Sequence, residues 1–100
     1  MDFQYNVSRN YNRINFQNIF GMQFLPSALK EIYDAVVKRS YKDLILDFSG
    51  LEAAFADGMV PLCSYVRYIK EEYNVSIEYV APKSVFGNFS FYSYKKACGQ

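Results

Sequence analysis

The chain has 100 residues, of which 51% are hydrophobic and 21% are charged, and its formal net charge is +1. This length predicts a single domain, 1–100, with a hydrophobic core of its own. The near-neutral charge argues against a partner held mainly by electrostatics, such as duplex DNA, so we expect no nucleic-acid partner. The chain has no histidine, which removes the commonest general base and the commonest zinc ligand. We therefore expect no metal site and no cofactor.

The two cysteines and the N-terminal residues indicate where the chain works. Cys63 and Cys98 are far apart and lie in no metal-ligand spacing. Cys63 falls on the apolar face of a predicted helix, so we expect it to be buried, and we expect Cys98 to be a free thiol. The first residues resemble no signal peptide, and no apolar run approaches the roughly 20 residues that cross a bilayer. We expect a cytoplasmic domain without membrane insertion.

The first third of the chain predicts two strands and a helix. Aromatic and aliphatic residues alternate with polar ones from Phe3 to Val7 and, more weakly, from Ile14 to Phe20, which predicts two strands. Ser8-Arg9-Asn10 between them predicts a turn. A helix should run from Pro26 to Arg39, because proline suits the first turn of a helix. Its apolar residues recur at helical spacing at Leu25, Leu29, Ile32, Tyr33, Val36 and Val37.

The middle of the chain predicts a second alternation of strand and helix. The compact apolar run from Leu44 to Phe48 is typical of a central strand. A helix should run from Gly58 to Tyr73, with Pro61 in its first turn and Asn74 as its stop. One face of this helix is apolar and carries Met59, Leu62, Cys63, Val66, Ile69 and Tyr73. Alternation from Val75 to Val80 predicts a fourth strand.

The order of these elements is β-β-α-β-α-β, which predicts an α/β fold. We expect a small mixed sheet of about four strands with helices packed on one or both of its faces. The core of the domain should span about residues 3–85. Residues 86–100 are rich in phenylalanine and tyrosine and form a C-terminal tail or a third helix.

The junction between the third strand and the second helix is the most informative stretch. A helix start gathers unpaired backbone N–H groups, so it suits an anion, a phosphorylated side chain or a partner protein. Asp57 is expected to cap the helix, and Gly58 either lets a backbone or a partner approach closely or only serves the helix start. Asp47 is expected to bond to the loop that follows its strand. The loop from Glu52 to Phe55 is expected to expose its apolar residues to a partner.

The run from Leu44 to Leu51, followed by Phe55-Ala56-Asp57-Gly58-Met59, resembles the core of the STAS domain (sulphate transporter and anti-sigma factor antagonist). In that family an apolar strand ends in Asp, a small loop follows, and Asp-Ser-Ser-Gly-Leu opens a helix. The resemblance implies a STAS-like fold and a regulatory role in protein–protein interaction. It covers about residues 3–85.

The chain departs from the family pattern at the residue that carries the switch. Switching members are phosphorylated on the first Ser of the motif, and this chain has Ala56 there. Phe55 replaces the preceding Asp, and Asp57 replaces the second Ser, while Gly58 and Met59 continue the pattern. The resemblance therefore implies a scaffold that cannot be phosphorylated at the usual position. Asp57 supplies one fixed negative charge in its place.

The leading hypothesis is a non-catalytic interaction domain. The resemblance implies a histidine-kinase-like (GHKL) ATPase as partner, either as a separate chain or fused in the same polypeptide. The expected docking surface comprises Phe55, Ala56, Asp57, Gly58, Met59 and Leu62, with Asp47 and Ser49 in support.

Two other classes of function remain as alternatives. A small-ligand or nucleotide-binding module would use the N-terminus of the second helix as an anion site, although the chain has no P-loop motif. An enzyme is disfavoured, because the sequence has no Gly-x-Ser-x-Gly elbow and no pair of carboxylates suited to acid–base catalysis.

Overall fold

The computed structural model describes residues 6–82, and these form a four-stranded sheet with two main helices. The elements are β1 (Val7–Asn10), β2 (Arg13–Phe20), the 3₁₀ turn η2 (Met22–Phe24), α1 (Leu25–Tyr33), the π-helical turn η3 (Asp34–Lys38), β3 (Asp43–Ala54), α2 (Ala56–Tyr73) and β4 (Ser76–Val80). The strand order is β1-β2-β3-β4, with β1 antiparallel to β2 and the other two pairs parallel. The predicted α/β class, mixed sheet and order β-β-α-β-α-β are confirmed.

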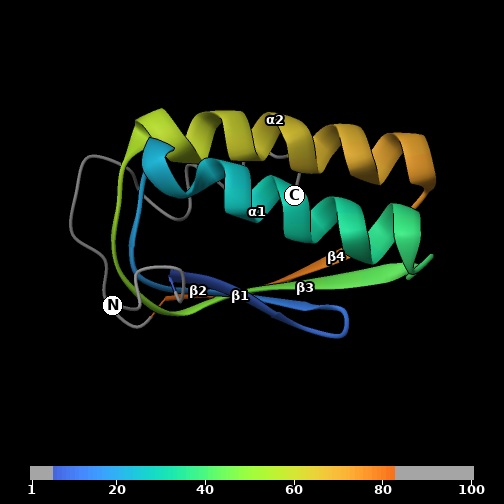
Figure 1. Cartoon of the computed structure of the whole chain (residues 1–100), viewed down its shortest axis with the longest axis horizontal. Coiled ribbons are helices and arrows are strands. Elements are labelled where there is room, and N and C mark those ends of the chain that lie inside the picture. The colour runs from blue at the N-terminus through green and yellow to red at the C-terminus, as the bar shows by residue number, and fades with distance from the viewer. Residues whose placement is uncertain (1–5, 83–100) are drawn as a thin grey trace.

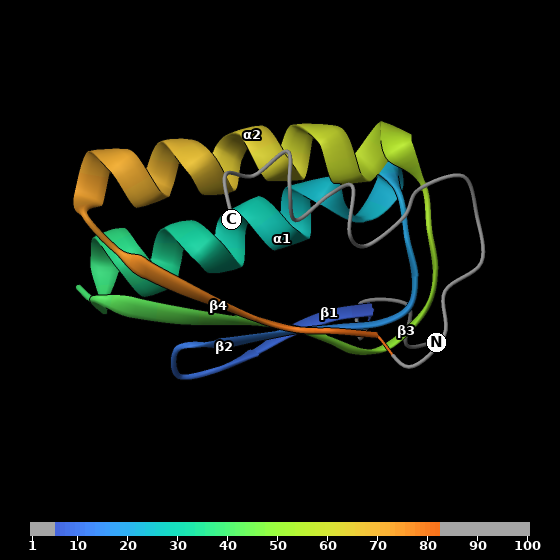
Figure 2. The ribbon, with the colours of Figure 1, turned by 180° about the vertical axis from the view of Figure 1, so that it is seen from behind.

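The molecule has two layers. Figures 1 and 2 show α1 and α2 side by side on the same face of the sheet. Each helix connects two neighbouring parallel strands, since α1 follows β2 and α2 follows β3. The start of α2 therefore lies at the same end of the molecule as the ends of β2 and β3. No helix within residues 6–82 is long and apolar enough to cross a membrane.

The core lies between the sheet and the two helices. Phe16 of β2 and Phe48 of β3 stack with ring centroids 4.6 Å apart, and Phe20 meets Phe16 edge-on at 5.3 Å. All three side chains are fully buried. The predicted apolar face of α2 supplies the helix side of this core, with Met59, Leu62, Cys63, Val66 and Ile69 all buried. Tyr73, which was expected on that face, is half-buried.

The buried face of α1 differs from the predicted one. The residues that it buries are Ala28 and Ile32, continued in η3 by Ala35 and Val36. Leu29 is half-buried and packs against this core, as predicted, but Tyr33 is exposed, so the predicted stripe is wrong at Tyr33. Short alanine side chains allow a helix backbone to approach the sheet closely. Which residues of a helix are buried therefore depends on packing as well as on hydrophobicity.

The first hairpin lies further along the chain than predicted. The structure continues β1 through Ser8, Arg9 and Asn10, which were predicted to form a turn, and places the turn at Tyr11 with φ 57°. Asn10 pairs with Arg13 across the hairpin. The Arg9 Nε donates to Glu31 Oε1 of α1 at 2.9 Å, which ties this strand to the helix layer. The start of the predicted first strand lies outside residues 6–82.

The third strand is longer than predicted and absorbs the expected loop. β3 runs past Phe48 to Ala54, and Leu51 and Ala54 are buried with 3% of their surfaces exposed. The pairing of β2 with β3 shifts register twice, and Asn18 adopts a positive φ of 64° beside the second shift. Figure 1 shows both strands bending toward the helix layer at this end. The expectation of a loop that exposes both alanines is therefore wrong, because the bent strand still packs on the core.

The second helix begins two residues earlier than predicted. It starts at Ala56, so Pro61 is its sixth residue and has no N–H to donate to the carbonyl of Asp57. The prediction that Pro61 lies in the first turn of this helix is therefore wrong. The predicted stop is confirmed, since Asn74 caps the helix in the left-handed conformation with φ 56°. Residues 83–100, including Cys98 and the aromatic tail, lie outside the described residues.

Candidate functional site

The start of α2 is packed against the turn that follows β2. Gly58 is buried, and a Cβ atom on it would lie 2.5 Å from the carbonyl carbon of Gly21 and 2.8 Å from its Cα. Real Cβ atoms do not approach backbone this closely, so only glycine fits at this position. Gly58 was expected to let a backbone or a partner approach closely, and in the structure it is the chain's own backbone at Gly21 that does so. It joins the start of α2 to the start of α1 through η2.

Asp57 contributes to the same junction, although not as a helix cap. The capping position is taken by Phe55, whose extended backbone makes no side-chain capping bond, so the capping prediction is wrong. Asp57 is the second residue of α2, and its Oδ1 accepts a hydrogen bond from the N–H of Met22 at 3.3 Å. A carboxylate in the first turn also complements the helix dipole. Asp57 therefore links α2 to η2 while its side chain stays exposed.

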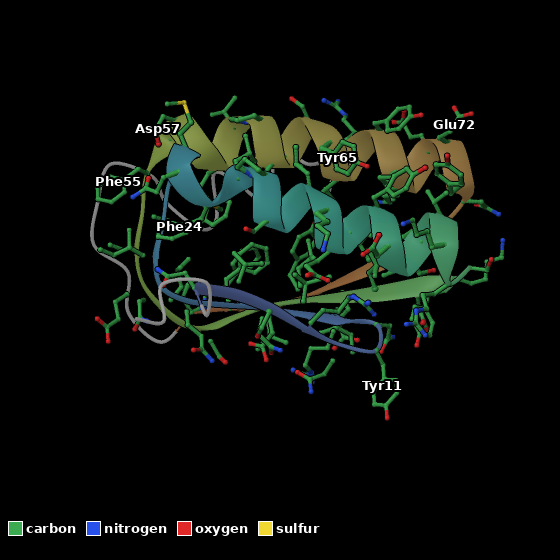
Figure 3. All side chains as sticks on the ribbon, in the orientation of Figure 1. Tyr11, Phe24, Phe55, Asp57, Tyr65 and Glu72 are labelled. Atoms are coloured by element: carbon green, nitrogen blue, oxygen red, sulfur yellow. The ribbon has the colours of Figure 1, made fainter. Side chains whose placement is uncertain are left out.

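Exposed apolar side chains surround this junction. Met22 is 61% exposed, Phe55 38% and Val60 53%. With the exposed Ala56 and Asp57 they form what we call the docking patch, defined as Met22, Phe55, Ala56, Asp57 and Val60. Figure 3 shows Phe55 and Asp57 projecting at this end of the molecule. Apolar side chains gathered at one exposed place are typical of interaction sites.

Half of the predicted site residues belong to the core and not to the surface. Gly58 is buried, Met59 is 1% exposed and Leu62 is fully buried. A partner cannot touch these three residues in this structure, so their prediction as contact residues is wrong. The reason is that they lie on the face of α2 that packs on the sheet. Their role is to hold the helix start in place beneath Phe55, Ala56 and Asp57.

Asp47 and Ser49 lie in the body of the third strand and outside the docking patch. Asp47 alternates along β3 with the buried residues Leu46 and Phe48, so it faces away from the helices. Its Oδ1 accepts a hydrogen bond from the N–H of Ser49 at 2.9 Å, and its Oδ2 accepts one from Arg13. Burial by itself raises the pKa of Asp47, but the hydrogen bonds from Ser49 and the Arg13 guanidinium outweigh it, and the net pKa is lowered. Neither residue contacts the docking patch through these bonds, so the supporting role predicted for both is not backed by the structure.

Sequence reasoning missed two members of the docking patch. Val60 follows the buried Met59, and a rotation of about 100° per residue places it on the outer side of α2. The helical pattern of the sequence could therefore have predicted that Val60 is exposed. Met22 lies between predicted elements, and nothing local to it indicates that it meets Asp57, which is 35 residues further along the chain. Only the fold brings the two together.

The geometry favours contact with a protein over binding of an anion. The N–H groups of Gly58 and Met59 both donate to the carbonyl of Phe55, at 3.1 and 3.0 Å. The exposed carboxylate of Asp57 repels negative charge at the same place. Within the described part of the chain, no three His, Cys, Asp or Glu side chains come close enough to hold a metal ion. No observation favours the nucleotide-binding alternative.

Comparisons with known proteins support the fold. No model of a known protein family matches this chain, and no curated protein matches it. One solved structure, described as "Crystal Structure Analysis of Mglu", is similar with a TM-score of 0.62 and 16% sequence identity. The match covers 80% of this chain and 20% of that chain, so this chain spans about a fifth of that protein's length. At this identity the likeness establishes the α/β fold alone.

Proposed function

We propose that this chain is a non-catalytic regulatory domain of the STAS type, which binds a partner protein through the docking patch. One observation carries the proposal: exposed Met22, Phe55 and Val60 surround the exposed start of α2. This is the same helix start at which the sequence resembles the family's switch motif. The backbone contact of Gly58 with Gly21 and the hydrogen bond from the Met22 N–H to the Asp57 carboxylate hold the two halves of the patch together before any partner arrives. A surface that is already ordered loses less conformational entropy when it binds.

The partner that the resemblance suggests is a cytoplasmic ATPase of the histidine-kinase-like (GHKL) class, separate or fused. Ala56 is the first residue of α2 and is exposed, but it carries no oxygen that could accept a phosphate. Binding through the patch is therefore constitutive, without control by phosphorylation at this position. In a chain with a phosphoacceptor here, a phosphate would add about two negative charges at the helix start.

Binding to purified candidate ATPases of that class tests the docking surface, with calorimetry as the readout. Phe55→Ser combined with Met22→Ser should weaken binding about tenfold or more, because truncation of an interface residue that carries binding energy costs more than about 1 kcal/mol. Tyr11→Ser is the matched control, since Tyr11 is 78% exposed on the β1–β2 hairpin, away from α2. Equal affinity for both variants would show that the patch is not the docking surface.

Phosphate transfer tests the absence of the switch. With radiolabelled ATP and the same ATPases, the natural chain should stay unlabelled and Ala56→Ser should become labelled at residue 56. The exposed position of Ala56 makes the substitution neutral for folding. Label on a serine of the natural chain near residue 56, such as Ser49 or Ser64, would show that the alignment with the family motif is wrong.

A further inference from the structure

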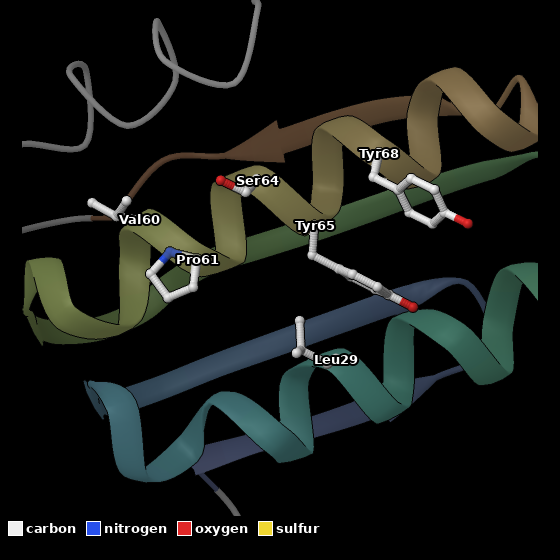
Figure 4. Close-up of a pocket in the computed structure, with 6 residues that line it drawn as sticks. All are labelled: Leu29, Val60, Pro61, Ser64, Tyr65 and Tyr68. Carbon is white, nitrogen blue, oxygen red and sulfur yellow. The ribbon is translucent and has the colours of Figure 1, made fainter.

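A second apolar surface lies between the two helices. It is an open groove of about 560 Å³, lined by Leu29 of α1 and by Val60, Pro61, Ser64, Tyr65 and Tyr68 of α2. Figure 4 shows Tyr65 reaching from α2 across toward α1, with Tyr68 one turn further along. None of the lining residues is charged. Its lining runs along α2 from Val60 to Tyr68, and Leu29 is its contact with α1.

The shape of the groove selects the kind of occupant. Ligand pockets typically bury most of a small molecule, and this shallow, wide-open groove does not. A helix lying in it would contact α1 and α2 together, as packed helices do at about 8–10 Å between axes. Tyr65 and Tyr68, with ring centroids 6.0 Å apart, offer the aromatic surface that is enriched at protein interfaces. Burial and the neighbouring tyrosines raise the pKa of Tyr65, so its hydroxyl stays protonated and can donate a hydrogen bond.

Charge marks both ends of the same flank of α2. Asp57, Pro61, Tyr65, Tyr68 and Glu72 recur at spacings of four, four, three and four residues, so they lie along one side of the helix. Figure 3 shows Asp57 and Glu72 at opposite ends of α2 with Tyr65 between them. The ion pairs among residues 6–82 are Arg9–Glu31, Arg13–Asp47 and Lys38–Asp34, so neither end carboxylate is paired there. The two carboxylates are separated by about 22 Å along the helix axis, at about 1.5 Å per residue.

We propose that this groove binds one amphipathic helix of a partner protein. The apolar stripe of that helix packs on Leu29, Tyr65 and Tyr68, and a Lys or Arg at each end of its flank pairs with Asp57 and Glu72. The proposal does not rest on the docking patch, although the two surfaces share Val60 and Asp57. A single partner can therefore contact both surfaces.

A second copy of this chain fits the groove poorly. Each described helix already uses its main apolar face on the sheet. Two copies that joined groove to groove would bring Asp57 and Glu72 of one copy to the same acidic flank of the other, and like charges oppose that contact. A basic amphipathic helix has the complementary charge.

Selection from a peptide library tests the proposal on the full chain. A displayed library of helical peptides of roughly 18 residues spans the flank from Asp57 to Glu72. Binders to the natural chain are counter-selected against Tyr68→Lys, whose side chain is 51% exposed, so the fold is retained and only the groove changes. The expected consensus has apolar residues at helical spacing and a Lys or Arg near each end. Absence of enriched peptides, or a consensus with acidic or uncharged ends, would overturn the proposal.

The affinity of a selected peptide for charge-reversed variants distinguishes an ion pair with Glu72 from attraction to the net charge of the chain. Glu72→Lys should weaken it about threefold to fivefold, the size expected for one exposed ion pair. Glu78→Lys is the matched control, because it makes the same charge change at an exposed position of β4, outside the groove, and should alter affinity less than about twofold. Equal effects of the two variants would refute pairing with Glu72. The docking-patch test changes Phe55 and Met22, which do not line the groove, and it is read with the ATPase, so the two proposals can fail separately.

Two rival occupants are measured in the same series. Sedimentation of the natural chain and of Tyr68→Lys reports self-association, and a dimer that this substitution dissociates would assign the groove to a second copy. A synthetic peptide of residues 83–100 that displaces the selected peptide would assign the groove to the chain's own C-terminal residues. Either result would overturn the proposal.

Discussion

At the scale of single residues, the contact of Gly58 with Gly21 decides how the helix start is held. A methyl group at residue 58 has no space, because the atoms 2.5 to 2.8 Å away belong to the backbone of Gly21. The turn must move before any larger residue fits. This turn also presents Met22, so the same contact positions one half of the docking patch.

Gly58→Ala should therefore destabilise the protein. Overpacking of this kind costs about 1–3 kcal/mol, which exceeds the helix propensity gained by alanine. Urea unfolding measures the loss. Gly50→Ala is the control, because the nearest atom to a Cβ there is the flexible Cγ of Gln17 at 3.2 Å, so the change should stay within about 1 kcal/mol. Equal stability of the Gly58→Ala variant and the natural chain would contradict the contact.

Asp47 makes stability depend on pH. Its pKa is lowered in the folded chain by hydrogen bonds from Ser49 and Arg13, which outweigh burial. A lowered folded pKa gives stability that is present above the unfolded pKa, about 3.9, and is lost as pH falls through the folded value. Asp47→Asn should cost about 1 kcal/mol at neutral pH, since neutral hydrogen bonds replace charged ones. Unfolding at a series of pH values should show the two chains converge in stability below about pH 4. A constant difference across that range would disprove the role of the carboxylate.

At the scale of elements, α2 combines a buried apolar face with an irregular second turn. Pro61 leaves the carbonyl of Asp57 without the helical donor that another residue would supply. Pro61 also lines the groove between the helices. A proline at a position that is unfavourable for the helix, on the surface of the proposed groove, is a departure from local helix preference of the kind found at functional sites.

Pro61→Ala should stabilise α2. The variant restores one N–H donor and removes the ring clash with the preceding turn, which together are worth about 1–3 kcal/mol. Thermal unfolding should show a higher midpoint than for Ser64→Ala, an exposed substitution one turn later that is expected to be neutral. A lower midpoint for Pro61→Ala would mean that the ring contributes more through packing than it costs through the backbone.

At the scale of the whole molecule, the helix layer and the edge of the sheet are joined by few polar contacts. Arg9 of β1 and Glu31 of α1 form one of them, with side chains 16% and 25% exposed. β1 is short and pairs with β2 through only four residues on each strand. The ion pair therefore contributes to docking this edge strand onto the helices.

A double-mutant cycle on Arg9→Ala and Glu31→Ala should give a coupling of about 1 kcal/mol, at the upper end of exposed pairs because both side chains are mostly buried. Raising the salt concentration should reduce it. Asp34 and Lys38, paired at 3.8 Å with Lys38 69% exposed, are the control, for which about 0.3 kcal/mol is expected. Equal coupling in the two pairs would show that partial burial adds nothing.

Local pattern alone determined the order β-β-α-β-α-β, the buried face of α2 and the stop at Asn74. These features follow from the spacing of apolar residues and from the conformations that single residues tolerate, and both are properties of neighbours in the sequence. The same logic fails where packing competes with it. Ala28 of α1 and Ala35 of η3 are buried while Tyr33 is exposed, and β3 continues to Ala54 because a bent strand still reaches the core.

Only the tertiary structure decided what the surface of this protein presents. Met22 joins Phe55 and Val60 because Gly21 and Gly58, which are 37 residues apart, touch through their backbones. The groove between α1 and α2 exists because the fold brings Leu29 of α1 to the same surface as Tyr65 of α2. Both surfaces are made by residues that are distant in the chain. These residues come into contact only when the whole chain is folded, so the sequence pattern around any one of them does not predict the surface.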